Sequence, residues 1–187
     1  MSAGVTLFTR QGLAATGIKQ ILDQADARFS SLYHHFPGGK DELAAAVIAQ
    51  SGAQYQRLVE VVWDSQPDTV TGVREVFEGA ADVLEATDYA DACPIATVAL
   101  EVASTNHELR MATADVFDAW VDSATARLVE AGATAGDART LAHAIIALLE
   151  GAFILCRATR STDPMRDAAR VAANLVREAV PVSATSR

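Results

Sequence analysis

The sequence contains little cysteine, proline or glycine. Its 187 residues include two cysteines, five prolines and eleven glycines. Cys93 and Cys156 show no paired pattern, so no disulfide framework is suggested. The prolines and glycines are scattered, which argues against a disordered segment. We recognise no signal peptide, and the long apolar runs fit helices that other helices could cover, so we expect a cytoplasmic protein.

Aromatic residues are also few. They make up 6% of the chain, although half of its residues are hydrophobic. Alanine is abundant, so a core would have to be built from small side chains at close helix spacing. Ala, Leu, Glu and Arg dominate the long segments, which favours an all-α fold. The length allows one domain or two small ones.

Metal-binding and catalytic patterns are missing as well. Four residues could be imagined as metal ligands, but their spacing matches no ligand pattern: Cys93, His107, His143 and Cys156. Buried thiols and capping or hydrogen-bonded histidines are the better interpretation. We expect no metal and no cofactor. A helical enzyme using His143 or Glu150 is conceivable, but no Ser-His-Asp or paired-carboxylate arrangement follows from the spacing.

Glu101 and Glu150 lie in mainly apolar segments. Each could be a polar group in a ligand pocket, or could pair with an arginine such as Arg127 or Arg157. The sequence leaves both possibilities open.

Basic charge is scarce overall but unevenly distributed. The net charge is −9. The first forty residues hold four basic and two acidic side chains, whereas the rest hold eleven basic and twenty-two acidic ones. DNA phosphates would repel the acidic part, so any nucleic-acid contact belongs to the first forty residues.

Residues 16–37 predict two short helices joined by a tight turn. Thr16 is the predicted cap of the first helix, and a polar turn follows at 25–27. The second helix, 28–36, carries four apolar residues at helical spacing, and Pro37 ends it. These four residues are Phe29, Leu32, Tyr33 and Phe36. Two such helices cannot bury a core alone, but the first can brace the second against the DNA major groove.

The remaining pattern predicts about nine helices in all. Gly12 ends a helix over 2–11, and Asn106 caps one that Gly132 ends. Asp163 is the predicted cap of the last helix. This last helix covers 163–180, and the other predicted helices cover 40–64, 70–87, 93–105 and 134–159.

The last two predicted helices carry surplus apolar surface, which suggests a homodimer built as a four-helix bundle. A monomer whose own core covers both helices is the alternative. The residues expected at the dimer interface are Leu141, Ile145, Leu148, Ala152, Val171 and Leu175.

The order of short helices, followed by Leu-Tyr-His-His-Phe-Pro and Gly-Gly-Lys, resembles the TetR family of bacterial transcriptional regulators. The residues that carry this resemblance span about 5–48, and they are Leu7, Phe8, Gly12, Thr16, Ile21, Ala25, residues 32–36, Lys40 and Leu43. Cys93-Pro-Ile-Ala-Thr-Val-Ala-Leu-Glu101 looks like the LmrA-like branch, whose members are drug- or flavonoid-responsive repressors.

The resemblance implies a three-helix helix-turn-helix head over 1–46 and a helical ligand-binding and dimerisation body over 47–187. It implies a repressor that a small hydrophobic molecule releases from double-stranded operator DNA. The alternative is a helical small-molecule binding protein that has lost DNA binding. The chain departs from the family at Asp26, where glycine is common, at Arg28-Phe29, and in lacking a basic arm before the first helix. Asp tolerates left-handed backbone at some cost.

Two groups of candidate site residues follow. Those expected to contact DNA are Thr16, Lys19, Arg28, Ser30, Ser31, Tyr33, His34 and Lys40, with an ordinary solvated face as the alternative. Phe29 is expected to pack rather than to read bases, and His35 and Phe36 to be structural. Those expected to line an effector pocket, with plain core packing as the alternative, are Phe77, Ile95, Val98, Phe117, Trp120, Val121, His143 and Phe153.

Overall fold

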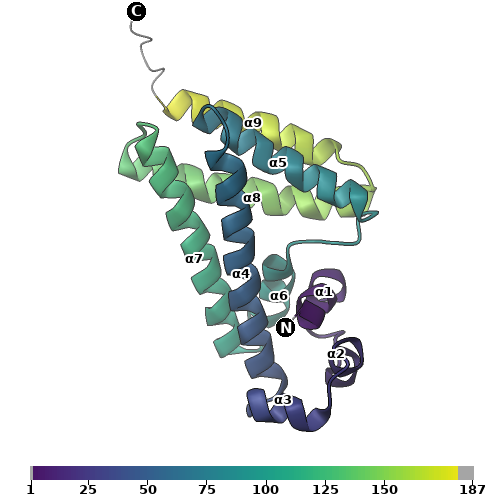
Figure 1. Ribbon diagram of the computed structural model, residues 1–187. Coiled ribbons are helices and arrows are strands. Elements are labelled where there is room, and N and C mark those ends of the chain that lie inside the picture. The colour runs from purple at the N-terminus through teal and green to yellow at the C-terminus, as the bar shows by residue number, and fades with distance from the viewer. Residues whose placement is uncertain (1, 181–187) are drawn as a thin grey trace, which may run out of the picture. The chain divides into compact units, whose positions relative to one another are not determined.

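The computed structural model describes residues 2–180, and all regular structure in this part of the chain is α-helical (Figure 1). The predicted all-α class and the predicted number of helices are confirmed for these residues. The nine helices are α1 (Ser2–Gln11), α2 (Ile18–Gln24), α3 (Phe29–His35), α4 (Lys40–Asp64), α5 (Thr69–Ala86), α6 (Pro94–Val102), α7 (His107–Glu130), α8 (Ala135–Thr159) and α9 (Asp163–Ala179).

The helices pack as two compact units. One unit combines Met1–Tyr55 with Asp91–Asp118, and the other combines Gln56–Ala90 with Ala119–Arg187. Both α4 and α7 contribute residues to both units. The first unit therefore contains α1 to α3 together with α6, although more than fifty residues separate α3 from α6 in the sequence. The predicted domain boundary after residue 46 stays a prediction.

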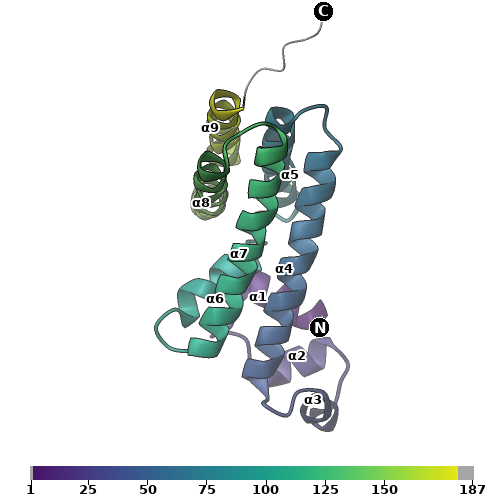
Figure 2. The ribbon, with the colours of Figure 1, turned by 90° about the vertical axis from the view of Figure 1, so that its left-hand side faces the viewer.

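The core of the first unit forms where α1, α4 and α6 bring their apolar faces together. Phe8 of α1 is fully buried, as are Ile48 of α4 and Ile95 of α6 to within 1%. Figure 2 shows α1 beside α6, in agreement with the close approach of their backbones. The three short N-terminal helices thus gain a core that they could not form alone.

The core of the second unit is built from small side chains. Nine of the twenty buried residues in its main cluster are alanine. Ala138 and Ala142 of α8 and Ala169 and Ala172 of α9 are buried almost completely. Small side chains allow the backbones of two helices to approach closely, and α8, α9 and α5 lie side by side in Figures 1 and 2. The predicted alanine-rich core is confirmed.

Most helix ends follow local signals in the sequence. Gly12 ends α1 with a φ of 78°, a conformation that favours glycine. The Asn106 Oδ1 accepts a hydrogen bond from the Leu109 N–H at 3.1 Å and so caps α7, as predicted. The Thr134 Oγ1 accepts one from the Asp137 N–H at 3.3 Å at the start of α8.

Two predicted caps were wrong. Gly17, not Thr16, is the residue that precedes α2, and it has no side chain to cap with. Thr16 is fully buried, and its hydroxyl donates to the Gly12 carbonyl instead. At the other end of the chain, Asp163 is the first residue of α9 rather than its cap, because the cap position falls on Thr162.

Helix α8 is long and apolar enough to cross a membrane by length and composition alone. However, Leu141, Ala142 and Cys156 of this helix are buried in the core that α8 shares with α9. Core helices of soluble proteins meet the same criterion, so the property is weak evidence for a membrane span.

Candidate nucleic-acid interface

The turn between α2 and α3 holds these two helices in a fixed relation. Asp26 adopts a left-handed conformation with a φ of 48°. The next residue, Ala27, donates its N–H to the Leu22 carbonyl at 2.9 Å. This is the hydrogen bond that closes the end of α2 and starts the chain toward α3. The sequence-based expectation that Asp26 takes the place of a turn glycine is confirmed.

Helix α3 buries only one of its seven residues, Leu32. Phe29 and Tyr33 were expected to pack, Tyr33 at least through its ring, yet their exposed fractions are 54% and 49%. His35, expected to be structural, is also exposed, whereas Phe36 is half-buried. The prediction for Phe29 and His35 was wrong because a helix of two turns meets its neighbours along a narrow line. An apolar spacing defines a face, but it does not show how much of that face is covered.

The exposed surface of α3 carries polar groups and no acidic side chain. Arg28 occupies the extended position just before the helix and is exposed. Lys19 is exposed on α2. The predicted DNA-contacting residues that are exposed on α2, α3 and the preceding position are Lys19, Arg28, Ser30, Ser31, Tyr33 and His34. Hydroxyl, guanidinium and imidazole groups can all hydrogen-bond to bases or phosphates.

Thr16 and Lys40 have a different position from these residues. Both interact with the loop between α1 and α2. The buried Thr16 hydroxyl binds the Gly12 carbonyl, so its side chain does not reach the surface and we revise its role to one of positioning. The Lys40 Nζ donates to the Leu13 carbonyl at 2.8 Å. An ammonium group has three donors, so this bond leaves capacity for a phosphate.

Gln11 organises the same loop, and sequence reasoning did not identify it. Its Nε2 donates to the Ala15 carbonyl at 3.2 Å, to the Thr16 Oγ1 at 3.1 Å and to the Gln20 Oε1 at 2.8 Å. Gln11 therefore ties the end of α1 to α2. A glutamine in the last turn of a helix gives no sequence signal for such a role.

Three side chains from the segment around α6 also hold the head, and we call Asp91, Glu101 and Asn106 the α6 clasp. The Glu101 Oε2 accepts a hydrogen bond from the Ala14 N–H at 2.8 Å. Asp91 forms an ion pair with Arg10 at 3.0 Å. The clasp thus connects both ends of the α6 segment to α1 and to the loop that follows it.

The third member of the clasp, Asn106, bonds to a different part of the head. Its Nδ2 donates to the Asp41 Oδ2 at 2.9 Å, in the first turn of α4. Because Asn106 also caps α7, one side chain connects the start of α7 to the start of α4. Sequence reasoning predicted the cap but not the contact with Asp41.

The eight predicted effector-pocket residues are divided between the two units. Ile95, Val98 and Phe117 belong to the first unit and the other five to the second. Four of the eight are buried, namely Phe77, Ile95, Val98 and Val121. Phe117, Trp120 and Phe153 are half-buried, and His143 is exposed. Phe77 and Val121 belong to the main core cluster of the second unit, which is the packing role given as the alternative.

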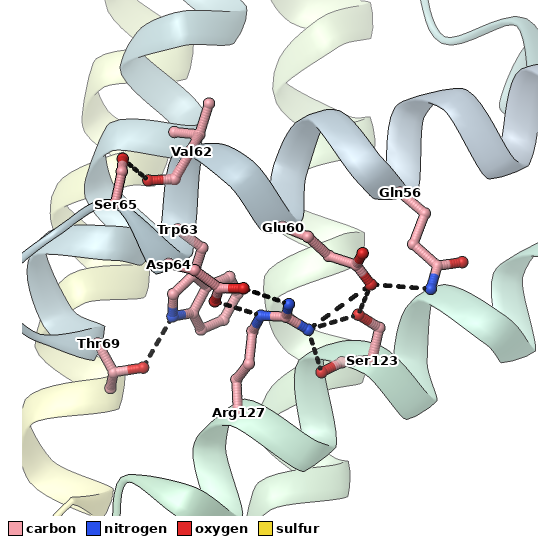
Figure 3. Close-up of polar contacts among 9 residues, drawn as sticks. All are labelled: Gln56, Glu60, Val62, Trp63, Asp64, Ser65, Thr69, Ser123 and Arg127. Carbon is pink, nitrogen blue, oxygen red and sulfur yellow. Dashed lines mark hydrogen bonds and ion pairs between the residues drawn. The ribbon is translucent and has the colours of Figure 1, made fainter.

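Arg127 is the centre of a polar network in the second unit (Figure 3). Its Nη2 and Nε bond to the two Asp64 carboxylate oxygens at 2.7 and 2.8 Å. Its Nη1 donates to the Ser123 Oγ at 2.8 Å and lies 3.7 Å from the Glu60 Oε1. The network therefore joins α7 to the last turns of α4, and its contacts indicate a structural role.

The network lowers the pKa values of its carboxyl groups. The hydrogen bond from Arg127 holds the pKa of Asp64 below its ordinary value. Hydrogen bonds from Gln56 and Ser123, with the charge of Arg127, lower the pKa of Glu60. Both groups are thus stabilised in the charged form.

Arg127 and Arg157 were named as possible partners of Glu101 and Glu150, and the structure shows which groups these arginines contact. Arg127 pairs with Asp64 and Glu60. Arg157 donates to the carbonyls of Tyr89 and Ala90, at 3.2 and 3.4 Å. Glu101 binds a main-chain N–H rather than an arginine.

The predicted dimer residues are of two kinds. Leu141, Ile145 and Ala152 are buried in the core of their own chain, and Leu148 is half-buried. Val171 and Leu175 of α9 remain 42% and 37% exposed. Two further residues of α8, Ile154 and Leu155, are 60% and 55% exposed and were not predicted. Three of the six assignments therefore describe the face of α8 that the chain itself covers.

Two protein-family models match the chain, one near its start and one over its second half. The family model of bacterial regulatory proteins of the tetR family matches residues 1–47. The model of the LmrA/YxaF-like transcriptional regulator C-terminal domain matches residues 69–171.

Among curated relatives, the HTH-type transcriptional regulator YxaF of Bacillus subtilis is 30% identical over 176 residues, which are 94% of this chain and 88% of that protein. The regulator LmrA of the same organism is 24% identical over 88% of both chains. A regulatory protein TetR from Rhodobacter sphaeroides has the same fold, with a TM-score of 0.83 at 21% identity over 93% of this chain and 95% of that one. A CifR variant solved with a 26-base-pair operator matches with a TM-score of 0.77 at 18% identity over 96% and 93%.

Proposed function

The chain belongs to the TetR family of bacterial transcriptional regulators and has an LmrA/YxaF-like C-terminal domain, and we propose that it is a repressor. In this proposal a small hydrophobic molecule releases the repressor from its operator. The observation that carries the DNA-binding part is the exposure of α3. All of its side chains except Leu32 are exposed, and none is acidic.

The proposed DNA contacts divide by chemistry. Arg28 can donate two hydrogen bonds to the O6 and N7 of a guanine. Ser30, Ser31 and His34 can contact bases or phosphates, and the Tyr33 hydroxyl can reach a phosphate. Lys19 and Lys40 supply charge, which contributes affinity independent of sequence.

We propose that the protein acts as a homodimer through α8 and α9. Ile154, Leu155, Val171 and Leu175 give these two helices an exposed apolar surface. A two-fold axis there would form a four-helix bundle. It would also present two copies of α3 to successive major grooves, about 34 Å apart or a multiple of that.

The effector would be a mostly apolar molecule, because aliphatic and aromatic residues dominate the candidate residues within each of the two units. It must bind the two states of the protein unequally in order to shift their populations. The α6 clasp supports this proposal, since any displacement of α6 would act directly on α1, on the loop after it and on the start of α4. Regulators of this kind act where the chromosome is, so we place the protein in the cytoplasm.

The experiment is a fluorescence-anisotropy titration of the full chain with DNA from the region that flanks its own gene. We expect salt-dependent binding, which Arg28→Ala weakens by about thirtyfold or more, because each half-site loses a base contact of about 1–3 kcal/mol. Arg74→Ala is the matched control, because Arg74 is an exposed arginine that pairs with its neighbour Glu75 on α5. Absence of binding at low salt would contradict the repressor.

The net charge of −9 favours a second candidate, a helical small-molecule binding protein without DNA binding. It predicts ligand affinity with no salt-dependent DNA binding, and no effect of Arg28→Ala. The same titration, repeated with a panel of hydrophobic aromatic compounds, therefore separates the two functions.

A further inference from the structure

Phe29 is the first residue of α3, and 54% of its surface is exposed. The other five phenylalanines all lie in the described part of the chain and are better covered. Phe8 and Phe77 are completely buried, and the remaining three are half-buried. A single exposed apolar side chain is ordinary on a protein surface, so exposure alone does not identify a partner.

The surroundings of Phe29 indicate what kind of partner it fits. Arg28 precedes it and Ser30 and Ser31 follow it, and all three are exposed. Tyr33, one turn further along the same side of the helix, is 49% exposed. A protein or lipid partner would favour a broader apolar patch, whereas two aromatic rings, Phe29 and Tyr33, beside cationic and hydroxyl groups match the edges of base pairs.

In the major groove the one apolar group that distinguishes bases is the C5-methyl of thymine, and phenylalanine side chains contact it. We propose that Phe29 reads a thymine methyl group in each half-site of the operator, next to the base pair that Arg28 contacts. This inference rests on the proposed function. It adds a specificity that hydrogen-bonding residues cannot supply, because uracil and thymine offer identical donors and acceptors.

The test uses the full chain and a duplex selected by that chain from a random-sequence pool. Each symmetric pair of thymines in the selected duplex is replaced in turn by deoxyuridine, which removes only the methyl group. One buried methyl contributes roughly 0.8 kcal/mol, so we expect one pair of positions to weaken binding about fifteen-fold, or about fourfold per half-site. The other thymines should be insensitive.

The Phe29→Ala variant tests whether the sensitivity to the methyl group depends on this ring. It should bind the thymine duplex and the uracil duplex with equal affinity, since it has no ring to contact the methyl group. Phe29→Leu should retain part of the difference, and Tyr33→Ala should weaken both duplexes equally. Because Phe29 is exposed, its variants should keep the unfolding temperature of the parent protein, which circular dichroism would verify.

The outcomes are distinguishable. If no thymine is sensitive to deoxyuridine, or if the difference persists in Phe29→Ala, the assignment is overturned while the DNA-binding function stands. If the difference vanishes in Tyr33→Ala instead, Tyr33 rather than Phe29 reads the methyl group and the assignment is also overturned. If the pool yields no bound duplex at low salt, the proposed function fails and the assignment fails with it.

Discussion

The carboxylate of Glu101 accepts a hydrogen bond from the main-chain N–H of Ala14, with 2.8 Å between the oxygen and the nitrogen. These residues are 87 positions apart. The bond fixes the loop between α1 and α2, and this loop sets where α2 begins and how α2 supports α3. A side chain from the segment that matches the C-terminal domain of the family thus fixes the backbone of the N-terminal head.

Removing this carboxylate should destabilise the first unit. Hydrogen bonds to charged groups contribute about 1.5–3 kcal/mol, and because Glu101 is only half-buried we expect Glu101→Ala to lower the free energy of unfolding by about 1–1.5 kcal/mol. Operator affinity should also fall, since the loop is less well fixed. Urea denaturation and anisotropy measure the two effects. Asp115→Ala, an exposed acid on α7, serves as control, and an equal effect there would refute the role of Glu101.

Gly12 and Glu101 should be energetically coupled. Gly12 has a φ of 78°, and a Cβ at this position would overlap the Glu101 Oε1. In Gly12→Ala the flexible carboxylate can move away, but it then loses the Ala14 N–H. We expect Gly12→Ala to cost about 1–2 kcal/mol from backbone strain, plus the cost of the lost bond. In the Glu101→Ala background only the strain should remain, so additive free energies of unfolding would contradict the coupling.

Two substitutions of Asp26 should change the stability of the protein and its DNA affinity independently. Its φ of 48° is unfavourable for most residues. Asp26→Gly relieves that strain, and we expect stability to change by between zero and about +1 kcal/mol, because glycine also gains entropy in the unfolded chain. Asp26→Asn keeps the backbone preference but removes an acid near Arg28, so it should tighten operator binding at low salt without raising the unfolding temperature. A stronger effect at high salt than at low salt would be inconsistent with this charge argument.

The Arg127 network should give the protein an acid-sensitive component of stability. The pKa of Asp64 is lowered by the hydrogen bond from Arg127, and that of Glu60 by Gln56, Ser123 and the charge of Arg127. Carboxyl groups whose folded pKa is depressed stabilise the fold above their unfolded pKa, and this contribution is lost as pH falls through the folded pKa. Stability should therefore fall between about pH 5 and pH 3.

Arg127→Met should flatten this acid dependence and destabilise the protein by about 1–2 kcal/mol at pH 7. The measurement is the free energy of unfolding in urea at a series of pH values. Arg139→Met is the control, because the pair of Arg139 with Asp122 is largely exposed and should contribute little. If the free energy of unfolding falls with acid as steeply in Arg127→Met as in the parent protein, the pKa of Asp64 does not depend on this arginine.

The exposed residues of α8 and α9 should control dimerisation. Ile154→Glu places a charge on each side of a two-fold interface, so we expect the dimer to dissociate at micromolar concentration and operator affinity to fall accordingly. Sedimentation equilibrium measures the state directly. Val61→Glu is the control, because it introduces the same charge at an apolar residue that is 69% exposed on α4, outside α8 and α9. A dimer that survives Ile154→Glu would place the interface elsewhere.

Helix positions could be predicted well because their signals are local. The segment 40–64 was predicted and observed with the same ends, and Gly12 and Asn106 terminate and cap the helices as expected. The exposed and buried sides of helices were less predictable. Apolar spacing groups Phe29 with Leu32, and Ile145 with Leu148, but only tertiary packing decides which group the chain covers.

Contacts between distant residues could not be predicted. Nothing in the sequence around Glu101 or Asp91 indicates that they bind Ala14 and Arg10. Thr16 had the residue type of a helix cap, yet burial directed its hydroxyl to the Gly12 carbonyl. The motif around α3 marked its polar side chains as candidates for DNA contact, whereas the residues that hold α3 in place gave no such signal.

The α6 clasp also limits how this chain can be recombined with other proteins. A chimera that grafts residues 1–46 onto another body would remove Asp91, Glu101 and Asn106, the partners of Arg10, Ala14 and Asp41. The head is therefore not a freely exchangeable module, either for an engineer or for gene recombination. A functional exchange should transfer the α6 segment together with the first 55 residues, so that Arg10, Ala14 and Asp41 keep their partners.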